Sequence, residues 1–365
     1  MFDDIRPFRD NEAPSIAKKL VNEQALQHSI ACYVMPSLFK VAPSFSQWLV
    51  KCYLAWRIKP INSVKEFQTE VAKYLHRLIK KSTDGFTFNG LNNLNMTKPT
   101  LFISNHRDIA LDPALMNLAL YKNGIETVEV AIGDNLLSKP WVSDLMRLNK
   151  SFIVKRGAKS KREMLTNSKN LSAYIHHTIT DKEQNIWIAQ REGRAKDGLD
   201  KTNAALISML LLNKPKEQAI EQYIEQLNIV PVSVSYEFDP CDNNKAIELA
   251  TIEETGEYQK SADEDLNSIT QGLLGYKGRV HIEFGQALTG YFENSKAIAA
   301  EIDRQIIQNY RLYNSNLAAK DKLQNAPHDN NALESLTQRM HGLTEAQQRW
   351  LLTMYANPVL AKEKY

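Results

Sequence analysis

Short apolar segments alternate with segments of helical periodicity from about residue 98 to residue 290, and this alternation restricts the fold more than any other feature of the chain. The apolar segments expected to form strands are residues 100–104, 127–132, 152–155, 186–189, 229–236 and 280–284. Helical patterns lie between them, over residues 112–121, 141–148, 161–180, 204–212 and 217–227. Strands that alternate with helices predict a layered α/β architecture with a mostly parallel central sheet.

The regions on either side are predicted to be helical. Before the sheet, Ser63 and Glu66 have the spacing of a capping box, apolar residues then recur at helical spacing to about residue 82, and a short strand follows at 86–88. After residue 291, isoleucines step by four at 298, 302 and 306. We therefore expect an α/β fold with helical N- and C-terminal extensions, in three regions: residues 1–95, 96–290 and 291–365.

Composition excludes several broad classes of protein. The 365 residues are 43% hydrophobic and 24% charged, which is typical of soluble globular proteins and not of disordered, collagen-like or multi-span membrane chains. The net charge of +3 gives no argument for nucleic-acid binding. No run of 18 uncharged apolar residues and no signal-peptide pattern are present. The three cysteines form no C-x-x-C pair, which favours reduced thiols and a cytoplasmic location.

Several common α/β enzyme motifs are absent. The sequence has no G-x-S-x-G nucleophile elbow, no G-x-G-x-x-G dinucleotide fingerprint and no H-E-x-x-H zinc motif. Glycine pairs with the spacing of a P-loop occur, but none is followed by lysine. Serine hydrolases of the α/β type, standard dinucleotide enzymes, zincins and P-loop nucleotidases are therefore disfavoured.

The most informative segment is the strand 100–104 with the residues that follow it. The strand delivers Asn105 and His106 to its carboxyl end, where open α/β sheets bind ligands, and a helix is expected to start at Asp112-Pro113. In this arrangement Asp112 can orient His106, which acts as a general base. Because no side-chain nucleophile is evident, the substrate's own hydroxyl would attack. Alternatively, Asp112 is only the N-cap of the helix.

Basic residues follow two further strands of the predicted sheet. Lys155 and Arg156 end one strand, and Glu192, Gly193 and Arg194 follow another. Parallel strands would bring these residues to one mouth, where guanidinium groups suit phosphate oxygens. Each basic pair could instead be an ordinary solvated loop end.

Together these segments resemble the motifs of the glycerolipid acyltransferases, typified by lysophosphatidate (1-acylglycerol-3-phosphate) acyltransferases. The resemblance covers about residues 98–236 and has four blocks in the family's order: Asn105-His106 with Asp112, the strand ending at Arg156, Glu192-Gly193-Arg194, and Val-Pro-Val around Pro231. The family usually has four residues between the histidine and the aspartate, whereas five stand here, which makes Asp108 a rival of Asp112. The third block also lacks the residue that usually separates glycine from arginine.

The resemblance implies an acyltransferase-like α/β fold and acyl transfer from acyl-CoA or acyl-carrier protein to a hydroxyl of a phosphorylated glycerol. It assigns His106 as the base and Asp112 as its orienter, and it assigns acceptor binding to Lys155, Arg156, Glu192, Gly193, Arg194 and Pro231. A lysophospholipid acceptor is expected, with no metal, no bound cofactor and no nucleic-acid partner. Alternatives are glycerol-3-phosphate or a lyso-aminolipid as acceptor, a thioesterase, or an inactive membrane-binding module.

Residues 33–56 are rich in aromatic side chains interleaved with lysines. This pattern is typical of a segment at a membrane interface, and it predicts peripheral attachment to the cytoplasmic face. An ordinary pair of core helices is the alternative.

Overall fold

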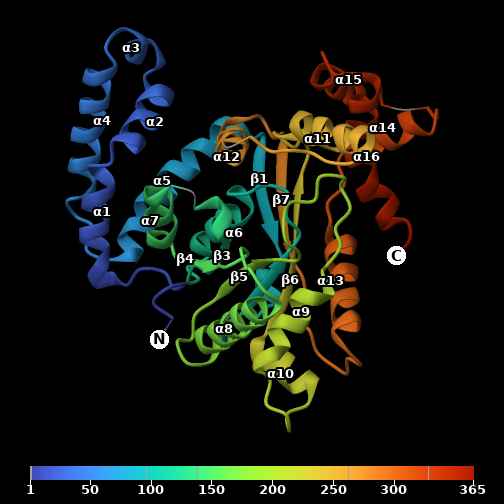
Figure 1. Cartoon of the computed structure of the whole chain (residues 1–365). Coiled ribbons are helices and arrows are strands. Elements are labelled where there is room, and N and C mark those ends of the chain that lie inside the picture. The colour runs from blue at the N-terminus through green and yellow to red at the C-terminus, as the bar shows by residue number, and fades with distance from the viewer. Residues whose placement is uncertain (1, 96, 138, 262, 328) are drawn as a thin grey trace. The chain divides into compact units, whose positions relative to one another are not determined.

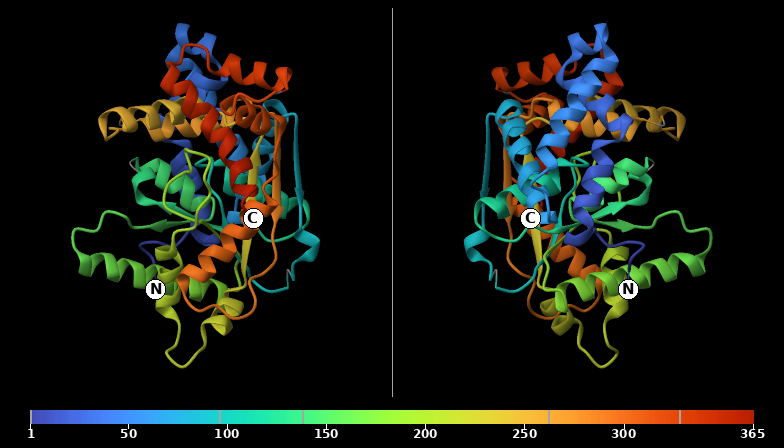
Figure 2. Two further views of the ribbon diagram at one scale, coloured as in Figure 1. Left: turned by 90° about the vertical axis from the view of Figure 1, so that its right-hand side faces the viewer. Right: turned by 90° about the vertical axis from the view of Figure 1, so that its left-hand side faces the viewer.

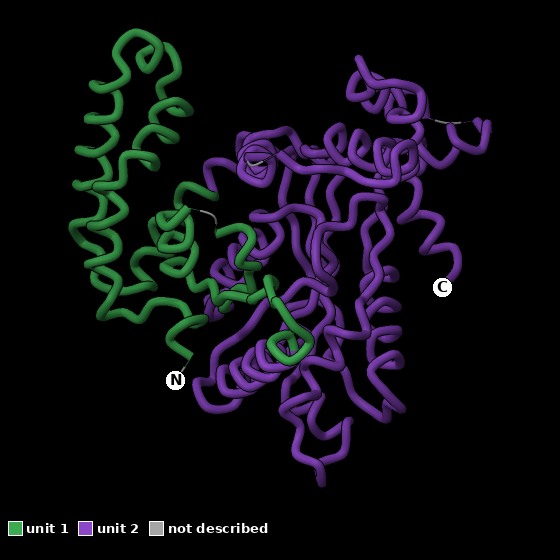
Figure 3. Tube along the Cα trace, in the orientation of Figure 1, with its two compact units in different colours: residues 1–75, 129–164 green, residues 76–128, 165–365 purple. Residues whose placement is uncertain are grey.

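The computed structural model describes residues 2–95, 97–137, 139–261, 263–327 and 329–365 (Figures 1 and 2). The chain divides into two compact units (Figure 3). Unit 1 contains residues 1–75 and 129–164, and unit 2 contains residues 76–128 and 165–365. The positions of the two units relative to each other are not determined. The three regions expected from the sequence, 1–95, 96–290 and 291–365, stay a prediction.

Unit 1 consists mostly of helices: α1 (Ala13–Val21), α2 (Gln24–Val34), α3 (Pro36–Val41), α4 (Pro43–Ile58), the first part of α5 (Val64–Ser82) and α7 (Pro140–Leu148). Helices α3 and α4 each begin with proline, which suits the first helical position. The predicted cap of α5 forms, with the Glu66 N–H donating to Ser63 Oγ at 3.2 Å.

The core of unit 1 joins its N-terminal helices to α7. Ala13, Ala17 and Leu20 of α1 pack with Val64 and Leu148. Two parallel strands, β3 (Glu129–Gly133) and β4 (Ser151–Val154), flank α7 in the sequence and pair in register at Val130 and Ser151. A strand, a helix and a second parallel strand form a βαβ crossover.

Unit 2 contains a five-stranded part of the sheet in the order β1-β7-β6-β2-β5. Its strands are β1 (Gly85–Asn89), β2 (Leu101–Ser104), β5 (Ile186–Ala189), β6 (Ile229–Tyr236) and β7 (Arg279–Phe284). Strand β2 lies between β5 and β6 and is parallel to both. Strand β7 is antiparallel to β6 and parallel to β1. The carboxyl ends of β2, β5 and β6 therefore lie at the same edge.

Helices surround these strands. They are α6 (Leu111–Lys122), most of α8 (Lys161–Thr180), α9 (Ala204–Leu210), α10 (Ile220–Leu227), α11 (Asp242–Thr255), α12 (Glu264–Leu274), α13 (Ser295–Asn309), α14 (Asn314–Leu323), α15 (Asn330–Arg339) and α16 (Glu345–Lys362). Every residue of β2 and β6 is buried, as expected for strands covered on both faces. Helix α16 packs against α11 and α14 near the carboxyl end of β6 (Figure 1).

The predicted fold class is confirmed. The strands are mostly parallel, they are flanked by helices, and helical segments precede and follow them. Some boundaries were wrong: the strand expected at 127–132 begins at Glu129, and the helix expected at 217–227 begins at Ile220. Helices α11 and α12 were not predicted from the sequence.

Substitution of Gly198 can test how closely α16 packs against the loop that follows β5. Its φ is +79°, and a Cβ there would lie 2.1 Å from the Met354 carbonyl oxygen in α16. Gly256 has a similar φ of +85° but nothing within 4 Å of its Cβ position. Gly256→Ala should cost about 1–2 kcal/mol of unfolding free energy through backbone strain. Gly198→Ala should cost about 1–3 kcal/mol more through overlap. Urea unfolding measures both, and equal losses would contradict the close packing.

Candidate active site

His106 lies just beyond the carboxyl end of β2. Its Nδ1 is 2.8 Å from Asp112 Oδ2, and its ring packs edge-on against Trp187, with centroids 5.7 Å apart. The indole N–H of Trp187 donates to Ser104 Oγ at 2.9 Å, which fixes the indole beside the histidine. The His106 side chain is 14% exposed. Because Asp112 engages Nδ1, Nε2 is the ring nitrogen that can receive a proton from a substrate.

Asp112 is fully buried and has hydrogen bonds to both carboxylate oxygens. In addition to Nδ1 of His106, Oδ2 accepts the backbone N–H groups of Arg107 at 2.6 Å and Asp108 at 2.9 Å. Oδ1 accepts the Tyr236 hydroxyl at 2.8 Å. Hydrogen bonds to an ionised carboxylate are strong, so these donors hold a negative charge at the histidine.

Asp108, the rival residue, performs the capping role that the sequence had offered for Asp112. Helix α6 begins at Leu111, one residue before Asp112, so Asp112 lies inside the first turn and is not the N-cap. Oδ1 of Asp108 accepts the N–H groups of Ala110 at 3.0 Å and Leu111 at 2.8 Å. The structure therefore pairs His106 with Asp112, while the catalytic roles of both residues stay a prediction.

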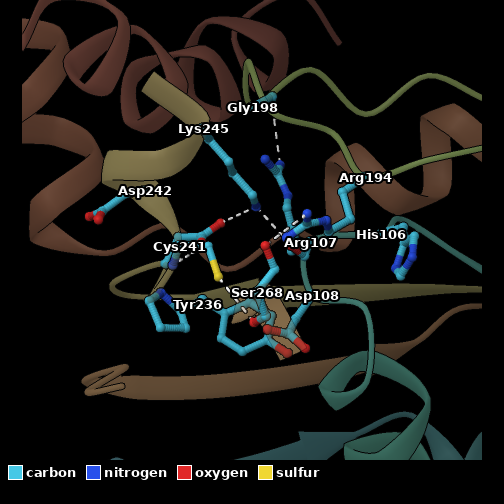
Figure 4. Close-up of polar contacts among 12 residues, drawn as sticks. His106, Arg107, Asp108, Arg194, Gly198, Tyr236, Cys241, Asp242, Lys245 and Ser268 are labelled. Atoms are coloured by element: carbon cyan, nitrogen blue, oxygen red, sulfur yellow. Dashed lines mark hydrogen bonds and ion pairs between the residues drawn. The ribbon is translucent and has the colours of Figure 1, made fainter. Parts of the chain in front are cut away.

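The loop after β5 lies beside the histidine. The Ala195 N–H donates to the His106 carbonyl oxygen at 2.8 Å, and the Gln190 N–H donates to the Ser104 carbonyl oxygen at 2.8 Å. Glu192 and Gly193 are exposed on this loop. Arg194 is only 9% exposed and extends toward Ser268, with Nη2 3.5 Å from its Oγ (Figure 4).

The other predicted binding residues belong to β6 and to unit 1. Pro231 is buried inside β6, in register with Ile103, and its carbonyl oxygen accepts the Gly285 N–H at 2.8 Å. Lys155 and Arg156 follow β4 in unit 1, are exposed, and Lys155 forms an ion pair with Asp4. The expectation that Lys155, Arg156 and the Arg194 loop lie together around His106 therefore stays a prediction.

Residues that contact the site were not predicted from the sequence, among them Trp187, Tyr236 and Lys245. Tyr236, the partner of Asp112, is the last residue of a strand that was predicted, so its place at the strand end was available as a signal. Lys245, which donates to the Arg107 carbonyl oxygen at 2.7 Å, lies on α11, a helix that was not predicted. Within the described residues, no group of three or more histidine, cysteine, aspartate or glutamate side chains is arranged to hold a metal ion.

The site combines an oriented imidazole with a buried negative charge at the end of a parallel strand. This arrangement suits proton abstraction from a hydroxyl, with the imidazolium stabilised by Asp112.

Comparison with known proteins gives the class of this domain. Residues 85–235 match the family model described as Acyltransferase. Over these residues the chain is similar to the acyltransferase family, which confirms the resemblance that its motifs carry.

Among solved structures, the chain is similar to the crystal structure of the 1-acyl-sn-glycerophosphate (LPA) acyltransferase PlsC from Thermotoga maritima. The identity is 12% and the TM-score is 0.36, and the similarity covers 78% of this chain and 95% of that one. A similarity this distant carries no argument about activity. No curated protein matches the chain by sequence.

Asp108 gives a pH-dependent prediction. Burial and the neighbouring Asp112 carboxylate raise the pKa of Asp108 to about 6 from 3.8. Since the folded state binds this proton more tightly, Asp108 should lower the stability of the fold as pH rises from about 4 through about 6. Asp108→Asn keeps an oxygen for both backbone donors and lacks this titration. Its unfolding free energy should therefore rise relative to wild type over this range, by at most about 3 kcal/mol.

Urea unfolding at a series of pH values from 4 to 8 measures this difference. Asp239→Asn is the matched control. Burial raises the pKa of Asp239, but the nearby Lys245 ammonium opposes this effect. The net pKa lies below 3.8. Because the folded and unfolded pKa values of Asp239 both lie at or below about 3.8, the deficit of this variant relative to wild type should stay nearly constant from pH 5 to 8 and shrink only as pH falls below about 4. A constant difference for Asp108→Asn would contradict the buried-charge assignment.

Proposed function

We propose that the protein transfers an acyl chain from an acyl thioester to the hydroxyl of 1-acylglycerol-3-phosphate, forming phosphatidate in phospholipid biosynthesis. The single observation that carries the proposal is the contact between His106 Nδ1 and Asp112 Oδ2 at the end of β2, inside a domain that matches the acyltransferase family. The donor would be acyl-CoA or acyl-carrier protein. No metal or bound cofactor has a role in the proposed reaction.

In the proposed reaction, Nε2 of His106 takes the proton of the acceptor hydroxyl as its oxygen attacks the thioester carbonyl. The new C–O bond forms, the C–S bond breaks, and the imidazolium returns the proton to the leaving thiolate. Asp112 stabilises the imidazolium. Backbone N–H groups near Gly193 would bind the oxyanion of the tetrahedral intermediate.

Acceptor binding is proposed for the basic residues of the motifs. Arg156 and Arg194 would bind the acceptor's phosphate, with Lys155 assisting, and the low dielectric around the largely buried Arg194 would strengthen its field. Glu192 would hold an arginine or a glycerol hydroxyl. Pro231 would act by shaping β6, since its ring is buried in the sheet.

Removal of the base tests the function. His106→Ala should lower transfer by about 10²–10⁴-fold, because it removes general-base catalysis. The matched control is His177→Ala on α8. The Nδ1 of His177 also contacts an aspartate, Asp181, at 2.6 Å. Thioester consumption would be followed with lysophosphatidate, glycerol-3-phosphate, a lyso-aminolipid or no acceptor.

The acceptor that supports the fastest turnover identifies the substrate. Equal thioester consumption without acceptor, with release of free fatty acid, would favour a thioesterase. Activity of His106→Ala within threefold of wild type would contradict the assigned base.

We also propose that unit 1 attaches the enzyme to the membrane surface. Phe45, Trp48, Tyr53 and Trp56 of α4 are each 45–61% exposed, which does not fit an ordinary core helix pair. Exposed lysines 40, 51 and 59 lie on and around the same helix. Amphipathic aromatic rings with basic residues favour the interface of an anionic bilayer. Among the described helices, none is long and apolar enough to cross a bilayer.

Vesicle flotation tests this attachment. Wild type should float with anionic vesicles, and Trp48→Ala/Trp56→Ala should bind at least about tenfold more weakly, because each large ring contributes roughly 1.5–3 kcal/mol when buried in apolar surroundings. Tyr121→Ala/Tyr291→Ala, which removes two exposed rings of unit 2, is the control and should float like wild type. Equal flotation of wild type and the tryptophan variant, or none by either, would contradict the proposal.

A further inference from the structure

Both sequence neighbours of His106 contact the same carboxylate. Asn105 Nδ2 donates to Asp200 Oδ2 at 3.0 Å, and Arg107 Nη2 donates to the same oxygen at 2.6 Å. The relative exposure of all three residues is 9% or less. Asp200 lies six residues after Arg194, on the loop between β5 and α9. One buried carboxylate thus links both sides of the histidine to the loop of the third motif.

Further contacts fix the same two segments. Arg107 Nη2 also donates to the Gly198 carbonyl oxygen at 3.1 Å (Figure 4), and its guanidinium lies 5.4 Å from the centroid of the Tyr310 ring. Asn105 is bonded in both directions to the backbone of Val234 in β6, at 2.7 and 3.0 Å. The backbone before and after His106 is therefore held by the side chains of its two sequence neighbours.

The ion pair of Arg107 and Asp200 is poorly arranged for stability alone. Burial raises the pKa of Asp200 against the opposing effect of Arg107. Within the described residues, Nε of Arg107 and Oδ1 of Asp200 are buried without a hydrogen-bond partner. Buried ion pairs that lack full hydrogen bonding often contribute no more than apolar side chains of the same volume. Unlike apolar side chains, this ion pair supplies directional hydrogen bonds.

We propose that Asp200 is a positioning residue, which through Asn105 and Arg107 sets the distance between His106 and the Arg194 loop. The inference rests on the proposed function, because this distance matters when one acceptor molecule contacts both the base and the loop. Misplacement of a reacting group by about 1 Å can lower a rate by about 10²-fold.

A paired substitution separates positioning from stability. Asp200→Leu alone leaves the Arg107 charge buried and unpaired, so it should be strongly destabilised. Arg107→Met/Asp200→Leu removes both charges and should regain stability close to that of wild type. Its kcat should nevertheless stay at least about tenfold below wild type, with the thioester KM unchanged. The matched control is Arg339→Met/Asp242→Leu, which removes an ion pair of unit 2 between a half-buried arginine and a buried aspartate. Among the described residues, neither partner is hydrogen-bonded to His106, Asn105 or Arg107, and this variant should keep kcat within about twofold.

A second measurement does not depend on activity. In protein with ¹⁵N-labelled histidine, the Nδ1–H proton shared with Asp112 can be assigned by its loss in His106→Ala. This resonance should shift or broaden in Arg107→Met/Asp200→Leu and keep its position in the control. Should the paired variant not fold, Asp200→Asn, which keeps an oxygen for both donors but lacks the charge, takes its place and should show a smaller change in the same direction.

Recovery of kcat together with stability, or an unshifted resonance in the paired variant, would overturn the inference. A wild type that transfers no acyl group would overturn the proposed function instead, and the resonance alone would then decide whether Asp200 positions His106.

Discussion

The site depends on a carboxylate that is buried and remains hydrogen-bonded. Asp112 is fully buried, yet it accepts two backbone N–H groups and the Tyr236 hydroxyl in addition to its contact with His106. An isolated charge would be costly at a fully buried position. The charge of Asp112 is tolerated because these groups form hydrogen bonds with it. The turn between β2 and α6 is shaped by these bonds, since two of the donors are the backbone of that turn. The same carboxylate therefore orients the imidazole and shapes the turn.

The choice between Asp108 and Asp112 shows where sequence reasoning reaches its limit. Both aspartates lie within two turns of His106, and either spacing is compatible with a contact in an undefined loop. The start of α6 at Leu111 decides the matter, because it commits Asp108 Oδ1 to the free N–H groups of the first turn. Helix starts are uncertain by one or two residues even when the helix itself is evident. The strand, the histidine, the helix and the partner Asp112 could be predicted, but excluding Asp108 required the exact start of α6.

For α11, one of the two helices that were not predicted, the physical cause is clear. Helix α11 buries Asp242, Lys245 and Glu248, which are charged residues that periodicity analysis assigns to a solvated face. Their burial is possible because partners arrive from distant parts of the chain. Lys245 donates to the Arg107 carbonyl oxygen, Asp242 pairs with Arg339, and Glu248 pairs with Lys196. No local pattern encodes such partners, whereas the strands could be predicted because their burial comes from apolar side chains alone.

These distant partners also show that the matched domain does not build its site alone. The family match ends at residue 235, yet the backbone of the histidine turn is held by Lys245 through the Arg107 carbonyl oxygen. The loop after β5 is held by α16, where Asn357 donates to the Asp197 carbonyl oxygen at 2.7 Å and Met354 packs against Gly198. Loops are usually the least constrained parts of a fold. Here the helices beyond the matched domain restrict the loop, so the segment that resembles an acyltransferase by sequence depends on the C-terminal region for its geometry.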